Sequence, residues 1–200
     1  MTVAAEPVAK KPAPKLGGPH LVGHGGPIKA IAATASGQRL LTGSFDYSMN
    51  LWHFDETGTP QLTRRFDDHG GAVSAAAFFA DGKRAASASD DGTVQIWDLD
   101  SGKRLRKLQG HTAKILGLDI STDQRLLASA SWDRTGRLWD IATGKAIATL
   151  SGHKGPVNAV RFSHDGKRLV SASYDGTLSL WDIERRSLIR AAYKHGWGIN

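Results

Sequence analysis

A serine, an aspartate and a histidine lie at spacings that could serve nucleophilic catalysis. In the stretch SASWDRTGRLWD, Ser131 lies two residues before Asp133, and His111 lies upstream of both. These are the residue types of a hydrolase triad, in which the histidine activates the serine and the aspartate orients the histidine. The same residues could instead be structural, and their distribution along the chain distinguishes the two roles.

The same residue types recur at a regular period. Successive histidines, and successive tryptophans, are separated by 45, 42 and 42 residues, and in each unit the serine lies eight and the aspartate six residues before the tryptophan. A period of this size indicates a repeat architecture. The four sets are His24, Ser44, Asp46 and Trp52; His69, Ser89, Asp91 and Trp97; His111, Ser131, Asp133 and Trp139; and His153, Ser173, Asp175 and Trp181.

Each unit contains four short apolar or alternating runs. In the fourth unit the runs span 157–162, 168–173, 178–183 and 187–192, and the turn signals His164-Asp165-Gly166-Lys167 and Tyr174-Asp175-Gly176-Thr177 separate the first three. Asp-Gly dipeptides favour tight hairpins, and no segment has the length and 3.6-residue periodicity of a helix. The sequence therefore predicts an all-β fold of four-stranded antiparallel units, with each repeated tryptophan on a third strand.

The pattern GH…SxDxxxxxWD, at a period of about 42 residues, resembles the WD-repeat β-propeller family. The resemblance covers residues 20–200, with units at about 24–68, 69–110, 111–152 and 153–194 and the start of a fifth at 195–200. It implies propeller blades. It also implies a hydrogen-bond relay in each blade, from the aspartate through the histidine and serine to the tryptophan indole.

This repetition argues against an enzyme. A catalytic triad is built once, in a cleft with an oxyanion hole, whereas four identical sets indicate scaffolding. We therefore expect no catalytic residues and no cofactor. The chain contains no cysteine, and the histidines outside the relay lack the spacing of a zinc site, so no metal site is expected either.

Composition narrows the partner class. The net charge of +7 could suit nucleic acid, but the lysines and arginines are scattered over turns and outer strands, so we do not expect nucleic-acid binding. No apolar run is long enough for a transmembrane helix, and residues 1–19, rich in Ala, Pro and Lys, are predicted to be a flexible tail. The absence of cysteine fits any compartment, so we expect a soluble protein, with the cytoplasm slightly favoured and the periplasm as the alternative if a signal peptide was removed.

Four units do not fill a seven-bladed ring, which is the commonest number in the family that the chain resembles. His20-Leu21-Val22 matches the end of an outer strand, and His195 begins a fifth unit. We therefore expect the N-terminal part of a longer propeller, with a smaller ring or an eight-bladed assembly of two copies as alternatives. Three positions depart from the repeat: Asp68 replaces a glycine, His53 replaces the aspartate of a Trp-Asp pair, and Gly136 replaces a core side chain.

The resemblance implies a rigid platform for protein partners, on the face made by the starts of the first strands and the turns between second and third strands. Three of the four residues that precede a relay aspartate are aromatic, as expected of a protein-binding patch, although these rings could instead pack flat on neighbouring blades. The predicted face comprises Lys29, Phe45, Ser74, Asp90, Lys114, Leu116, Trp132, Asn158 and Tyr174.

Two functions remain open. The first is a non-catalytic scaffold for protein–protein interaction. The second is a regulatory or positioning domain of a larger redox protein, because stretches such as ASDDGTVQIWDL and HGWGIN are similar to bacterial WD-repeat domains fused to a c-type cytochrome. No CxxCH haem site is present in these 200 residues.

Overall fold

The computed structural model describes residues 22–194, which form sixteen β-strands in four separate antiparallel sheets. Each sheet is a meander of four consecutive strands, and we call the sheets blades 1 to 4. The strands of blade 1 are β1 (Ile28–Ala33), β2 (Arg39–Ser44), β3 (Met49–Phe54) and β4 (Pro60–Phe66). Those of blade 2 are β5 (Val73–Phe78), β6 (Arg84–Ser89), β7 (Thr93–Asp98) and β8 (Arg104–Gln109).

The other two blades repeat this plan. The strands of blade 3 are β9 (Ile115–Ile120), β10 (Leu126–Ser131), β11 (Gly136–Asp140) and β12 (Ala146–Leu150). Those of blade 4 are β13 (Val157–Phe162), β14 (Arg168–Ser173), β15 (Thr177–Asp182) and β16 (Ser187–Lys194). The all-β prediction and the placement of each repeated tryptophan on a third strand are confirmed, and the part of the chain from 22 to 194 contains no helix.

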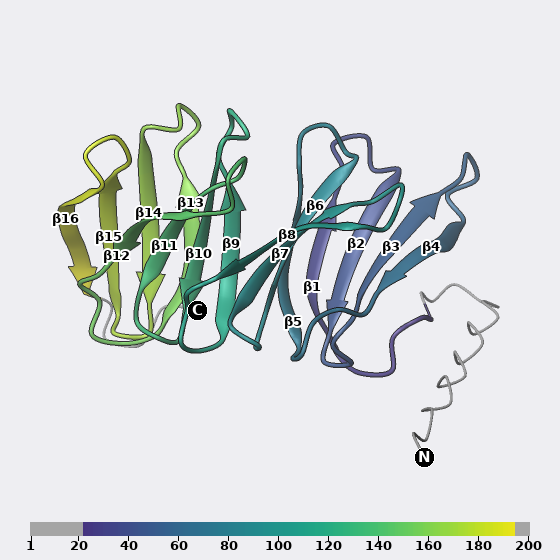
Figure 1. Ribbon diagram of the computed structural model, residues 1–200, viewed down its shortest axis with the longest axis horizontal. Helices are drawn as coiled ribbons and strands as arrows, with labels where there is room; N and C mark the ends of the chain where they lie inside the picture. The colour runs from purple at the N-terminus through teal and green to yellow at the C-terminus, as the bar shows by residue number, and fades with distance from the viewer. Residues whose placement is uncertain (1–21, 195–200) are drawn as a thin grey trace, which may run out of the picture.

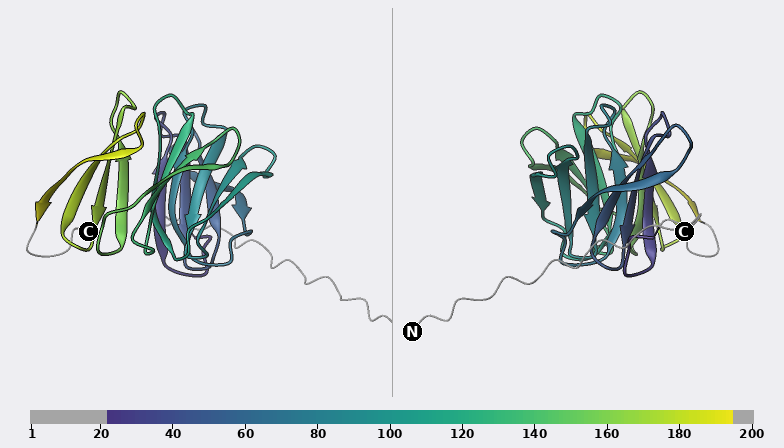
Figure 2. Two further views of the ribbon diagram at one scale, coloured as in Figure 1. Left: turned by 60° about the vertical axis from the view of Figure 1, so that its left-hand side comes forward. Right: turned by 90° about the vertical axis from the view of Figure 1, so that its right-hand side faces the viewer.

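The blades lie side by side in chain order and form an open arc, with blades 1 and 4 at opposite ends (Figures 1 and 2). The first strands β1, β5, β9 and β13 contact one another in succession. The predicted tail at 1–19, the outer-strand match at His20-Leu21 and the fifth unit at 195–200 lie outside the described residues.

Apolar side chains between the blades form the core. Each inner blade has a preceding face, which packs on the blade before it in the chain, and a following face, which packs on the blade after it. The first residues of β5, β9 and β13 lie on preceding faces, and Leu41, Ala86 and Ala128 lie on following faces. The contact recurs because the repeat places the same two surfaces on each blade.

Turn chemistry fixes the hairpins. Asp98 accepts hydrogen bonds from the backbone N–H of Ser101 at 2.7 Å and from its hydroxyl at 2.7 Å, and Asp140 does the same for Thr143. In blade 1 the equivalent residue is His53, and Asp55 instead accepts from Thr57 and Thr59 in a longer turn. The departure at His53 therefore moves the capping carboxylate along the chain without removing it.

Gly136, the third departure, lies in β11 and is buried. A Cβ at this position would lie 3.4 Å from Leu150 Cδ1 and 3.5 Å from Leu150 Cβ, so a side chain of the adjacent strand β12 already occupies much of the space. Leu150 therefore replaces part of the core packing that the buried side chains of Met49 and Val94 supply at this position in blades 1 and 2.

Candidate functional site

Each blade contains a buried hydrogen-bond relay, and blade 3 shows its geometry. His111 Nδ1 lies 2.6 Å from Asp133 Oδ2, and His111 Nε2 lies 2.7 Å from Ser129 Oγ. The indole N–H of Trp139 donates to the same Ser129 oxygen at 2.8 Å. With Nδ1–H donated to the carboxylate, the serine hydroxyl donates to Nε2 and accepts from the indole, which satisfies each buried polar group.

The other three blades repeat this relay with little variation. The His Nε2 to hydroxyl distance is 2.7 Å and the Trp Nε1 to hydroxyl distance is 2.8 Å in each. The Nδ1 to carboxylate Oδ2 distances are 3.2, 3.0 and 3.3 Å in blades 1, 2 and 4. The hydroxyls come from Thr42, Ser87 and Ser171.

The hydroxyl assigned to the relay from the sequence was wrong. Ser44, Ser89, Ser131 and Ser173 were predicted, but the relay hydroxyl lies two residues earlier in each second strand. The strand register explains the difference, because Trp52 pairs with Leu40 across the ladder. Thr42 is then about 6.6 Å along β2 from that pair, whereas Ser44 is about 13 Å away and beyond reach of the indole.

The four predicted serines instead hold the turns that present the relay aspartates. Ser131 Oγ donates to the Lys114 carbonyl at 2.8 Å and accepts from the Asp133 N–H at 3.1 Å. Ser44, Ser89 and Ser173 likewise accept from the N–H of their relay aspartates. They donate to the carbonyls of Gly26, Gly71 and Gly155, which are equivalent to Ala113, a second acceptor of the Ser131 hydroxyl at 3.2 Å. They therefore fix the turn at the end of each second strand.

A third set of hydroxyls, which the sequence analysis missed, completes each aspartate's hydrogen bonding. Thr135 donates to Asp133 from its backbone N–H at 3.0 Å and from its hydroxyl at 2.6 Å. Ser48, Thr93 and Thr177 occupy the equivalent positions. The signal was available, because a serine or threonine follows every relay aspartate by two residues.

The surroundings of each relay favour the ionised form of its aspartate. Burial raises the pKa of the Asp46 carboxyl, but hydrogen bonds from Ser48 and Gly25 and the charge interaction with His24 outweigh burial and leave that pKa well below its usual range. The pKa values of the Asp91 and Asp175 carboxyls are also lowered, because hydrogen bonds outweigh the effect of burial. The aspartates are thus charged acceptors at neutral pH.

In blade 3 the histidine pKa is also displaced. Burial lowers the pKa of His111, the hydrogen bond and charge of Asp133 oppose that shift, and nearby Arg137 adds to it. The imidazole is therefore held neutral, which matches the tautomer that the relay requires.

The relay is unsuited to nucleophilic catalysis. Ser129 and Ser131 are both fully buried, and Ser129 Oγ is already hydrogen-bonded to an imidazole and an indole. The buried hydroxyl therefore leaves no space beside it for a substrate carbonyl. This arrangement can stabilise a blade but cannot attack a substrate.

The residues of the predicted face lie at one end of the sheets, at the lower edge of Figure 1, where second strands end and third strands begin. The side chains of Phe45, Trp132 and Tyr174 are 48%, 50% and 48% exposed. The turns that carry these rings are equivalent, because the backbone N–H of each aromatic residue donates to the carbonyl of the residue just before the first strand. The accepting carbonyls belong to Pro27, Lys114 and Pro156. Half-exposed rings therefore recur at this end of blades 1, 3 and 4.

The fourth equivalent position carries an acid. Asp90 is only 13% exposed and lies between two lysines, with Lys29 Nζ at 3.7 Å and Lys114 Nζ at 3.1 Å. Lys29 also lies over the Phe45 ring, 5.2 Å from its centroid. This ion-pair cluster joins blades 1, 2 and 3 across the predicted face.

The remaining predicted face residues are less accessible. Ser74 was expected on the face but is buried, and its hydroxyl donates to the carbonyls of Ala88 and Ile115. Leu116 and Asn158 are half-buried. Conversely, Tyr47 is 53% exposed beside Phe45 and was missed, although it follows a relay aspartate directly.

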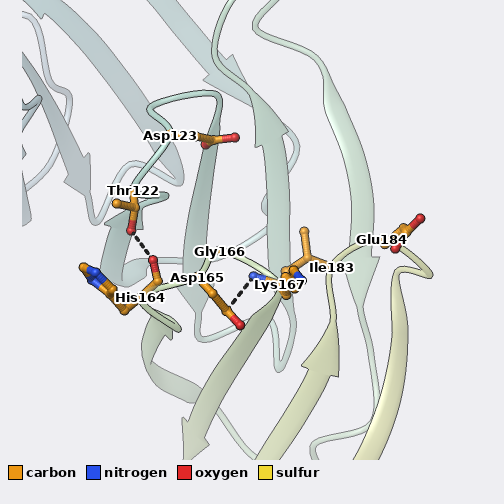
Figure 3. A pocket seen from close by; sticks show the side chains of 8 residues that line it. All are labelled: Thr122, Asp123, His164, Asp165, Gly166, Lys167, Ile183 and Glu184. Atoms are coloured by element: carbon orange, nitrogen blue, oxygen red, sulfur yellow. Dashed lines mark hydrogen bonds between the residues drawn. The ribbon is translucent and has the colours of Figure 1, made fainter.

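A shallow depression of about 410 Å³ lies at the opposite end of the sheets, between blades 3 and 4 (Figure 3). The Thr122 hydroxyl donates to the His164 carbonyl at 3.0 Å, and the Lys167 N–H donates to Asp165 at 3.0 Å. Figure 3 shows the carboxylates of Asp123 and Glu184 well apart on different loops. Within residues 22–194 no group of three or more metal-ligating side chains converges, and no helix is long and apolar enough to span a membrane.

Comparison with known families agrees with this geometry. The model of the WD domain, G-beta repeat, matches four segments, at residues 18–53, 60–98, 102–140 and 144–182. The chain belongs to the WD-repeat family. A search of curated proteins found no match.

The matched segments are offset from the blades. Each of the last three begins with the fourth strand of one blade and ends with the third strand of the next, as segment 60–98 does with β4 and β7. Each sequence repeat therefore connects two neighbouring blades. Repeats of this family generally serve as protein-interaction scaffolds and are typically non-catalytic, and the match bears on the repeats alone, so the cytochrome-fused subfamily stays a prediction.

Proposed function

We propose that this chain is a non-catalytic scaffold that binds a protein partner through the end of the blades that carries Phe45, Trp132 and Tyr174. The observation that carries the proposal is the exposure of these three rings, each about half accessible at an equivalent turn. Large rings that are exposed in the free protein contribute strongly to association when a partner covers them.

The support beneath the rings favours a preformed surface. Each turn is fixed by the serine at the end of the second strand and by the relay aspartate, as in the bonds that Ser131 donates to the Lys114 carbonyl and that Asp133 accepts from the Thr135 N–H. A surface that is already ordered loses little conformational entropy when it binds. The Lys29–Asp90–Lys114 cluster supplies polar contacts between the rings.

The test is a selection of random peptides displayed on phage against the wild-type chain, followed by binding measurements on the selected peptides. We expect Trp132→Ala and Tyr174→Ala each to weaken binding at least tenfold, while the melting temperature shifts little because the rings are half exposed. The matched control neutralises Arg104, Arg106 and Lys107 on outer strand β8 and should leave binding unchanged. Peptides that still bind both aromatic variants but do not bind the β8 variant would place the binding site on the outer strands instead.

A further inference from the structure

On the basis of the function proposed above, we propose that the partner segment is acidic, with Asp or Glu side chains that bind Lys29 and Lys114 on either side of Asp90. The segment crosses blade 2 at the end of the sheets that carries the exposed rings, at the lower edge of Figure 1. The charge of the partner is thus set by an ion-pair cluster that joins three blades.

Two lysines on blades 1 and 3 approach one carboxylate on blade 2. Lys114 Nζ lies 3.1 Å from Asp90 Oδ2, and Lys29 Nζ lies 3.7 Å from Asp90 Oδ1. The second distance is too long for a hydrogen bond, and Asp90 Oδ1 accepts none from the rest of the described chain. Because an ammonium group has three N–H donors, both lysines can bind a further carboxylate while they stay beside Asp90.

The other exposed charges on the predicted face are positive. The side chain of Lys114 is 54% exposed, and Arg134 and Lys154 are exposed without an ion-pair partner among residues 22–194. The carboxylates are largely covered, because the side chains of the relay aspartates are between 7% and 15% exposed and that of Asp90 is 13% exposed. The accessible charge is therefore cationic.

Two exposed acids follow outer strand β4 at the same end, beside the start of β3. Both have arginine partners on outer strands, with Arg65 Nε 2.6 Å from Asp67 and Arg104 3.4 Å from Asp68. These acids therefore do not neutralise the lysines near the rings. The positive charge there remains available to a partner.

Blades 1 and 3 also place large side chains where this turn favours glycine. The residue after the relay aspartate has a φ of 69° at both Tyr47 and Arg134, whereas Gly92 and Gly176 occupy the position in blades 2 and 4. A residue with a Cβ is disfavoured in this left-handed region, and residues kept there often belong to binding sites. The turn thus presents an exposed ring and an exposed cation at the cost of backbone strain.

Blade 2 lies between these two blades and presents no large side chain in its own turn. Its Gly92 is buried, and its Asp90 lies low beside the lysines. Phe45 and Tyr47 are exposed on blade 1, and Trp132 is exposed on blade 3. A peptide that crosses blade 2 can therefore contact rings on both sides and place its carboxylates on the lysines between them.

The arrangement suits separate single charges better than closely spaced phosphates. Asp90 keeps a negative charge between the two lysines and repels a phosphate, which carries nearly two charges, more strongly than a carboxylate. The cations are spread over blades 1, 3 and 4, on Lys29, Lys114, Arg134 and Lys154. Asp and Glu side chains spaced along an extended peptide match this distribution.

The first test compares two peptide libraries displayed on phage, which share their aromatic and apolar positions. One library carries only Asp and Glu at the other positions, and the second carries only Lys and Arg. We expect the wild-type chain to select binders from the acidic library, with an affinity that falls about tenfold between about 0.05 and about 0.5 M salt. Binders that come mainly from the basic library, or that are insensitive to salt, would overturn the proposal.

The second test reverses the charge of the cluster. Lys29→Glu combined with Lys114→Glu should weaken binding of the selected peptides by about tenfold or more. The matched control, Lys103→Glu combined with Lys145→Glu, makes the same charge change in turns between third and fourth strands, at the opposite end of blades 2 and 3. It should leave the affinity nearly unchanged, and equal losses would show that net charge alone attracts the peptides and would rule out the cluster as their site.

The third test restores the pairing. Peptides in which Lys replaces each Asp and Glu should bind the Lys29→Glu, Lys114→Glu variant more tightly than they bind the wild type. Such a gain requires a folded site, so it separates lost charge complementarity from unfolding. A variant with unchanged circular dichroism and no gain would contradict the proposal.

Two further outcomes separate the acidic partner from the scaffold function on which it rests. Peptides that are lost in Trp132→Ala but bind the lysine-reversed variant normally would leave the scaffold function standing and overturn the acidic partner. A single-stranded oligothymidylate of similar length serves as the polyanion probe, and we expect it to bind more weakly than the peptides. If it binds as tightly as they do and is lost on lysine reversal, the site takes nucleic acid, and the acidic peptide is the wrong occupant.

Discussion

Blades 1 and 3 carry isoleucine at the same position of the repeat, as Ile28 and Ile115, and yet the first is 50% exposed and the second fully buried. The local structures agree, because each residue begins the first strand of its blade and pairs with the last residue of the second strand. The difference is the neighbour, since blade 2 covers Ile115 and no described blade covers Ile28. Sequence repetition therefore sets which residues a face presents, and the adjoining blade sets what their burial contributes to stability.

The largest expected difference comes from removing these two side chains. Ile115→Ala should lower the free energy of unfolding by about 2–5 kcal/mol, because it removes buried methylenes and leaves a cavity. Ile28→Ala should cost less than about 1 kcal/mol in a single chain, since half of the side chain is already in water. Denaturant unfolding of the two variants measures both costs. Equal costs would show that Ile28 is buried in the isolated chain and would end the comparison.

The relay provides a contrasting pair, because all of its hydrogen bonds join residues of one blade. Ser129→Ala leaves the His111 imidazole and the Trp139 indole without a buried partner and should cost about 1–3 kcal/mol. Thr42→Ser in blade 1 retains the hydroxyl and serves as the control, whereas Thr42→Ala should cost about as much as Ser129→Ala. Thermal unfolding of the three variants tests this, and a much smaller cost for Thr42→Ala would mean that blade 1 is loosened as a whole.

Acid should weaken blade 3 in a defined pH window. The pKa of His111 in the folded chain lies below 6.5. Below about that pH the unfolded chain therefore binds a proton that the folded chain does not bind, and stability decreases as the pH is lowered. The Asp133 carboxyl, whose pKa is lowered from 3.8, contributes stability that is complete above that value and is lost only at lower pH. Unfolding free energies of the wild type and His111→Gln should therefore diverge in slope between pH 6.5 and 3.8. Parallel slopes in that window would show that His111 titrates alike in the folded and unfolded chains.

The fold was predictable from the sequence because four copies of one pattern reinforce each other. A single Trp-Asp pair is weak evidence for a fold. A tryptophan that recurs at a nearly constant period leaves few alternatives to repeated β-meanders, and it does so at Trp52, Trp97, Trp139 and Trp181. The relay histidines and aspartates were also found in this way. Composition and spacing thus determined the elements and their order.

The relay hydroxyl could not be chosen from spacing alone. Three serine or threonine positions repeat in all four units, represented in blade 3 by Ser129, Ser131 and Thr135, and each lies at a constant sequence distance from the tryptophan. Only the strand register, which pairs Trp139 with Leu127, places the indole beside Ser129. The accessibility of Ser74 and Ile28 was similarly beyond the sequence, because it depends on which blade lies next to each residue.

The smallest expected effects concern two glycines in blade 3, Gly136 and Gly117, which differ in the space around them. A Cβ at Gly136 would meet Leu150 and the Ser129 carbonyl at ordinary contact distances of 3.4–3.5 Å, so Gly136→Ala should fit. It should raise the free energy of unfolding by about 0.4–1 kcal/mol, because alanine reduces the entropy of the unfolded chain without strain in the folded one. A Cβ at Gly117 would instead lie 2.8 Å from the Asn158 carbonyl oxygen and 3.3 Å from Ala159 Cα, both backbone atoms of blade 4. Gly117→Ala should therefore destabilise the chain, since β13 would have to move away. Chemical denaturation of the two variants decides the matter, and a loss of stability in Gly136→Ala would show that Leu150 cannot yield and that the glycine is required for packing within the blade.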